Sequence, residues 1–160
     1  MPAWLTSLLP TEGLKIILVL FLSFLIGFER EEHLADPSGP ERYAFGGVRT
    51  FPLLGLIGYA LSLVSGDNLI PPTVGFAVIG AFLWLSYQHK LATYKSAGVT
   101  TETSGLVTYL VGVLVSHGQW WIATTIAVTS VLLLELKTAL EICRVVCREK
   151  KSWRSRNFCF

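Results

Sequence analysis

The densest group of oxygen-bearing side chains in this sequence lies between Gly98 and Gly105, where Thr100, Thr101, Glu102, Thr103 and Ser104 follow one another. Donor sets made only of oxygen suit hard cations such as Mg²⁺, which usually keeps several of its own water molecules. A local role is equally open, because Thr100 is a good helix cap and Glu102 suits the positive end of a helix dipole. The sequence therefore offers Thr100, Thr101 and Glu102 as an ion-site hypothesis, without assigning a metal ligand set.

Two further groups of charges stand at the ends of apolar runs. Glu29 and Arg30 close the first run, and Arg49 stands just before the second. A carboxylate at the carboxyl end of a helix opposes the macrodipole and gains from a nearby cation. An ion pair between Glu29 and Arg49 is the simplest way to keep both charges at one depth, with Arg30 as the other possible partner. The structural alternative is that Arg30 reaches the lipid headgroups while the glutamates stay in water.

Residue sets that support soluble-type catalysis are not recognisable in the sequence. His33, His89 and His117 lie in separate segments. Cys143 and Cys147 are four positions apart, which is not a common zinc-ligand spacing, and together with Cys159 we expect them to be free thiols. We therefore expect a protein that is not an enzyme and that has no cofactor and no committed metal site.

The composition shows what must position these side chains. Hydrophobic residues make up 52% of the 160 residues and charged residues only 15%, against about 25% charged in typical soluble domains. Between Thr50 and Leu136 the charges are too sparse to give each helix a polar stripe that could face water. The composition therefore predicts an integral membrane protein.

Five apolar runs of 15 to 18 residues predict an all-α, polytopic transmembrane helix bundle with about five spans, although a full span takes ~20 residues. The two shortest runs can borrow residues, the first from 4–9 and the second from 43–48. We expect one membrane domain over residues 1–140 and a short basic cytoplasmic tail over 141–160. The runs are Gly13–Phe28, Phe51–Ser65, Pro71–Tyr87, Val99–Ser116 and Gln119–Leu136.

The distribution of lysine and arginine predicts the orientation. These residues follow the first, third and fifth runs, and the loops after the second and fourth runs have none. Because cytoplasmic loops carry the excess of Lys and Arg, the amino terminus is expected outside and the carboxyl terminus inside. The basic tail is expected to meet anionic lipid rather than nucleic acid, since no nucleic-acid motif accompanies it.

Small residues recur every four positions along the fourth run, at Ser104, Thr108, Gly112 and Ser116. A stripe of this kind lets another helix approach closely. It is a candidate contact in a homo-oligomer, and it is equally able to face a helix of the same chain.

Three short motifs in this order resemble the membrane domain of the MgtC/SapB family. They are Leu25-Ile-Gly-Phe-Glu-Arg-Glu31, Gly47-Val-Arg-Thr50 and Gly98-Val-Thr-Thr101, and the resemblance covers residues 11–140. It implies a multi-pass protein of the bacterial inner membrane. It also singles out Glu29, Arg30, Arg49, Thr100 and Thr101 as the motif residues, and together with Glu102 we expect them to form one polar cluster or ion site near the cytoplasmic face.

The resemblance also implies a function. Members of the family are linked to magnesium transport and to growth at low magnesium, and one branch to virulence and to restraint of the proton-driven ATP synthase. We therefore expect a role in ion transport or homeostasis, with a homo-oligomer or a second membrane domain or protein as partner. The alternative is a regulatory or scaffolding membrane protein that moves nothing. A third hypothesis, an intramembrane enzyme, is the least favoured by the sequence.

Two features depart from the virulence branch. Glu102 follows the threonine pair where that branch has a small residue, which resembles the branch fused to a second membrane domain. The chain continues after the resemblance only as a short basic tail, which fits either a natural short form or a truncated one.

Overall fold

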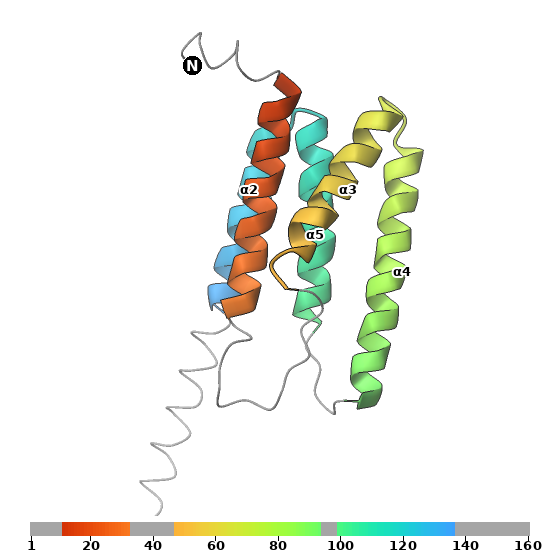
Figure 1. Ribbon diagram of the computed structural model, residues 1–160, viewed down its shortest axis with the longest axis vertical. Helices are drawn as coiled ribbons and strands as arrows, with labels where there is room; N and C mark the ends of the chain where they lie inside the picture. Colours follow the sequence, from red (N-terminus) through yellow and green to blue (C-terminus); the bar gives the residue numbers. More distant parts are fainter. Residues whose placement is uncertain (1–10, 33–46, 94–98, 137–160) are drawn as a thin grey trace, which may run out of the picture.

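The computed structural model describes residues 11–32, 47–93 and 99–136, and these parts are all-helical (Figure 1). Each of the five apolar runs forms one helix, which confirms the predicted helical bundle. The tail over 141–160, with its three cysteines, lies outside the described residues. The labelled helices are α2 (Thr11–Glu32), α3 (Thr50–Ser65), α4 (Ile70–Thr93) and α5 (Thr100–Ser116), and a further helix covers Trp120–Leu136.

Successive helices run in opposite directions (Figure 1). The last turns of α2 and α4 therefore lie at the same end of the bundle as the first turns of α3 and α5. We call this the Arg30 end and the opposite one the Glu12 end. Helix α3 runs obliquely and contacts α2, α4 and α5. The end of the first motif and the starts of α3 and α5, which follow the other two motifs, therefore lie at one end of the molecule.

Helices α2 and α4 are long and apolar enough to cross a membrane. In their 18-residue apolar windows only 28% and 11% of the residues are buried inside the structure, so they are not core helices of a soluble protein. Phe21, Val78 and Phe82 remain more than 60% exposed. Apolar surface of this extent is costly in water and is ordinary in lipid.

The remaining helices are shorter than a full span. Helix α3 begins at Thr50 rather than at residue 43, because residues 47–49 form a turn. Its 16 residues correspond to ~24 Å, less than the hydrocarbon thickness of ~30 Å. The helix over Trp120–Leu136 is also apolar but short. The residues that the first run was expected to borrow, 4–9, lie outside the described part.

Glycine makes two of the connections tight. Gly66 ends α3 with φ 58°, and Gly118 links α5 to the last helix with φ 75°. Both angles lie in the left-handed region, which glycine adopts without steric cost. The amide of Gly118 donates to the carbonyl oxygen of Val115 at 3.0 Å. The predicted antiparallel hairpin between the fourth and fifth runs is therefore present.

The small-residue stripe of α5 packs inside the chain. A Cβ atom placed on Gly112 would overlap the carbonyl oxygen of Gly55 in α3, and one on Gly58 would overlap the carbonyl oxygen of Tyr109. Thr108 is fully buried. Of the two partners left open by the sequence, the structure therefore selects a helix of the same chain for this stripe.

Candidate functional site at the Arg30 end of the bundle

The motif that closes α2 is fixed against the start of α3. A Cβ atom on Gly27 would lie 3.0 Å from the carbonyl oxygen of Val48 and 3.1 Å from Cβ of Phe51, so only glycine allows this approach without a shift. One turn later, Oε2 of Glu31 accepts a hydrogen bond from the Val48 amide at 2.9 Å. These contacts hold the last turn of α2 in place and orient the two charged residues between them.

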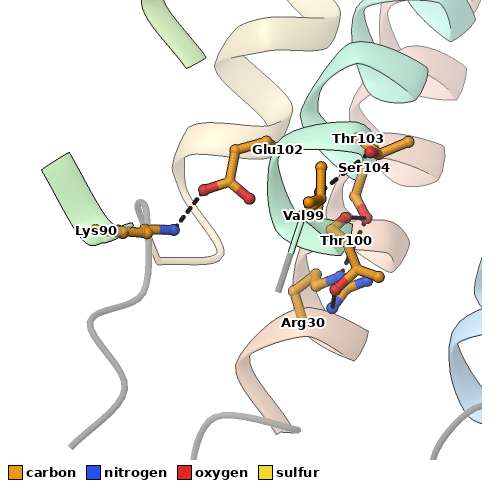
Figure 2. A network of polar contacts seen from close by, with 7 residues as sticks. All are labelled: Arg30, Lys90, Val99, Thr100, Glu102, Thr103 and Ser104. Carbon is orange, nitrogen blue, oxygen red and sulfur yellow. Dashed lines mark hydrogen bonds and ion pairs between the residues drawn. The ribbon is translucent and has the colours of Figure 1, made fainter. Parts of the chain in front are cut away.

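Arg30 crosses from α2 to the first turns of α5 (Figure 2). Its Nε atom donates to Oγ of Ser104 at 3.1 Å, and Nη1 donates to Oγ1 of Thr100 at 3.4 Å. The Ser104 hydroxyl donates in turn to the Thr100 carbonyl oxygen at 2.7 Å. Arg30 is only 8% exposed. Its guanidinium is thus held by the hydroxyl groups of α5 and is largely removed from solvent.

Glu102 is bound from the other side of α5. Nζ of Lys90, in the last turn of α4, lies 2.6 Å from Oε1 of Glu102, and Figure 2 shows Lys90 and Arg30 approaching the first turns of α5 from different sides. Glu102 is 5% exposed. The pair is therefore largely removed from water. In such low-dielectric surroundings the attraction between the two charges is stronger, and removing one partner is costly because the other charge is left buried.

Glu29 completes the charged group and is also buried, at 7% exposure. Glu29 precedes Arg30 in α2, and Glu102 lies in the first turn of α5 with Thr100, one of the two hydrogen-bond partners of Arg30. We call Glu29, Arg30, Lys90 and Glu102 the charged cluster. It contains two acids and two bases contributed by three helices, α2, α4 and α5.

Two buried atoms of the cluster, Nη2 of Arg30 and Oε2 of Glu102, have no hydrogen-bond partner within the part of the chain that the structure describes. Leaving a buried polar atom unpaired costs ~1–3 kcal/mol, and more for a charged group. The hydrogen-bonding capacity of the charged cluster is therefore only partly satisfied by the described residues.

The structure separates the residues that the sequence proposed as one site. Glu29, Arg30, Thr100, Glu102 and Ser104 converge at the Arg30 end, and Thr101 is half-buried beside them in α5. Arg49 is exposed at the N-cap of α3, and the described residues show no ion pair between it and Glu29. The proposed Glu29–Arg49 ion pair is therefore not among these contacts and stays a prediction, while Arg30, the residue next to Glu29, contacts the hydroxyl groups of α5.

Thr100 has a different role from the one expected. Val99, not Thr100, occupies the N-cap of α5, and no side chain caps that end. The Thr100 hydroxyl accepts from Arg30 instead. Lys90 was not predicted as the partner of Glu102, although a lysine in the last turn of an apolar helix is a signal for a nearby acid.

A second polar group lies at the Glu12 end and was not predicted. The Tyr59 hydroxyl donates to Oε2 of Glu12 at 2.6 Å, and Lys15 pairs with Oε1 of the same carboxylate at 2.9 Å. Ser62 and His117 share a hydrogen bond of 3.0 Å. These contacts join α2, α3 and the end of α5. They show that the bundle is closed by polar contacts at both ends.

The geometry defines a class of protein: an all-helical membrane protein with a buried charged cluster at one end of its helices. Among the described residues no group of three His, Cys, Asp or Glu side chains is placed to hold a metal ion. The family model for the MgtC family matches residues 16–142, most of the chain, and the protein belongs to this family. Neither the curated proteins nor the solved structures gave a match.

Proposed function

We propose that this protein acts in magnesium-related ion transport or ion homeostasis in the bacterial inner membrane, with its carboxyl terminus in the cytoplasm and without enzyme activity. The observation that carries the proposal is the burial of Arg30 and Glu102 in a bundle whose long helices expose apolar side chains. Charged groups inside membrane proteins are costly and mark ion pathways, proton relays or counter-ion sites.

The position of the cluster supports the same role. It joins α2, α4 and α5 where the Lys- and Arg-containing loops meet the helices, on the side proposed to be cytoplasmic. Glu102 also supports a relation to the branch of the MgtC/SapB family in which this domain is fused to a second membrane domain. The small-residue stripe packs within the chain, so an oligomer or a partner membrane protein would use another surface, such as the apolar face of α4.

A second candidate function is regulation or scaffolding without transport, and the closure of the cluster favours it. Glu102 is already paired with Lys90, and its side chain is 6% exposed. A transporter must open this group to water from one side, whereas a scaffold can keep it closed.

The deciding measurement is Mg²⁺ flux in proteoliposomes that contain a magnesium-sensitive dye. Native protein is compared with Glu102→Gln and with Glu135→Gln, a matched control because Glu135 is an exposed acid on the last helix. Transport predicts flux in the native protein and in Glu135→Gln, and its loss in Glu102→Gln. Equal flux in all three would reject the cluster as the pathway. A correctly inserted native protein without flux would reject transport and support the regulatory alternative.

A further inference from the structure

Arg49 lies at the Arg30 end but outside the charged cluster. It occupies the N-cap of α3 and is exposed, and the described residues show no hydrogen bond or ion pair of its side chain. The helix that follows it exposes Leu53 to 57% and Ile57 to 44%, as expected of a helix that faces lipid. An arginine at such a boundary lays its carbon stem along apolar surface and keeps its guanidinium among the headgroups. Arg49 is therefore a cation that is available to a partner from the membrane.

The outer face of α2 carries an open apolar groove. Its volume is about 220 Å³, and its lining residues are Phe21, Phe24, Leu25 and Phe28. Each of these side chains is at least 36% exposed, and the rings of Phe24 and Phe28 stack with their centroids 6.3 Å apart. Because the lining residues are all apolar, the groove suits a hydrocarbon ligand. In a bilayer that ligand is an acyl chain.

The groove and Arg49 adjoin at the Arg30 end. Phe28 and Glu31 are three positions apart, which makes them neighbours on the surface of α2. Oε2 of Glu31 accepts a hydrogen bond of 2.9 Å from the amide of Val48, the residue before Arg49. A Cβ atom on Gly27 would lie only 3.0 Å from the carbonyl oxygen of Val48. Figure 1 shows the turn before α3 beside the last turns of α2. The groove therefore lies in the apolar part of α2, with the cation close to its end.

We propose that Arg49 and the groove of α2 bind an anionic phospholipid, with the phosphate at the Arg49 guanidinium and one acyl chain in the groove. A guanidinium matches the geometry of a phosphate and binds it through paired hydrogen bonds. Anionic lipids are enriched in the cytoplasmic leaflet, on the side where this end of the bundle is proposed to lie. The inference goes beyond the proposed function and holds with or without transport. The bound lipid would join the last turns of α2 to the start of α3, beside the charged cluster.

The test is native mass spectrometry of the purified full chain in detergent, with equal amounts of phosphatidylglycerol and phosphatidylcholine that carry the same acyl chains. The readout is the ratio of bound phosphatidylglycerol to bound phosphatidylcholine, which should favour phosphatidylglycerol in the native protein. One interfacial cation strengthens the binding of an anionic lipid about fivefold. Arg49→Gln should therefore lower this ratio about fivefold, whereas Arg49→Lys should keep most of it. Because Arg49 is exposed, its replacement leaves the packing of the helices intact.

Two matched controls separate the phosphate from the acyl chain. Lys15→Gln removes a cation that pairs with Glu12 at the opposite end, and it should keep the native lipid ratio. Phe24→Ala shortens the wall of the groove, so it should lower the amounts of both bound lipids without changing their ratio. Leu85→Ala removes a 67% exposed side chain of α4 and should leave both amounts as in the native protein.

The proposal is overturned if Arg49→Gln keeps the native ratio of the two lipids, which would leave Glu29 as the predicted partner of Arg49. It is also overturned if Lys15→Gln lowers the ratio as much as Arg49→Gln does. Equal amounts of bound lipid in Phe24→Ala and Leu85→Ala would reject the groove as the acyl-chain site. None of these outcomes depends on the flux measurement, so this proposal and the proposed function can fail separately.

Discussion

The Arg30 side chain of α2 donates a hydrogen bond of 3.1 Å from Nε to the hydroxyl of Ser104 in α5, across 74 positions of the chain. This contact joins two helices that are not neighbours in sequence. It also gives Arg30, one of the motif residues, a hydrogen-bond partner that the motif itself does not contain.

Ser104→Ala removes the acceptor for the Arg30 Nε atom and is expected to destabilise the protein. A hydrogen bond to a charged group contributes about 1.5–3 kcal/mol, and the loss leaves a buried donor unpaired. Thr103→Ala is the control, because the Thr103 hydroxyl is exposed and bonds only to its own helix at Val99. Thermal unfolding in detergent measures both. Equal midpoints for the two variants would contradict a structural role for the Arg30–Ser104 contact.

Gly112→Ala should weaken the packing of α5 on α3. The added Cβ would overlap the carbonyl oxygen of Gly55, which belongs to a helix backbone and cannot move freely. Overpacking of this kind costs about 1–3 kcal/mol. Gly80→Ala is the matched control, because its Cβ would meet Leu106 at an ordinary 3.8 Å. Gly80→Ala is expected to be neutral or stabilising, and a comparable loss in both variants would argue against close α3–α5 contact.

Tyr59→Phe removes the donor to Glu12 and should lower the unfolding midpoint. The expected loss is smaller than that of Ser104→Ala, because the Glu12 side chain is 47% exposed and water can replace the hydroxyl. Tyr87→Phe removes a hydroxyl for which the described residues show no hydrogen bond, and it should leave the midpoint unchanged. If Tyr59→Phe were as stable as native protein, the polar contact at the Glu12 end would not contribute to stability.

The orientation proposed from lysine and arginine positions can be measured by thiol labelling. In a chain whose native cysteines are replaced by serine, Asp67→Cys places one thiol in the exposed turn after α3. An impermeant maleimide should label this thiol in intact spheroplasts. A chain that keeps only Cys159 should be labelled after the membrane is opened. The reverse labelling pattern would show that the orientation is opposite to the one proposed, with the carboxyl terminus outside.

The sequence alone determined the class of protein, the number of helices and the general position of the site. Apolar runs with few charges require lipid and helical hydrogen bonding, because each backbone polar group in lipid must be satisfied within the segment. These properties depend on local sequence, so helix boundaries agreed closely for α3 and α5. The motif residues Glu29, Arg30 and Glu102 were likewise identified from their charge in apolar surroundings.

Only the tertiary structure decided which charged groups meet. Helix packing turns Arg30 toward Ser104, pairs Lys90 with Glu102 and leaves Arg49 exposed. Sequence spacing specifies a face of one helix but not the rotation or the depth at which two helices pack. In this bundle the rotation of α3 and α5 is set by close contacts at Gly58 and Gly112. Because glycine has no side chain, the sequence does not indicate which residue each of them contacts.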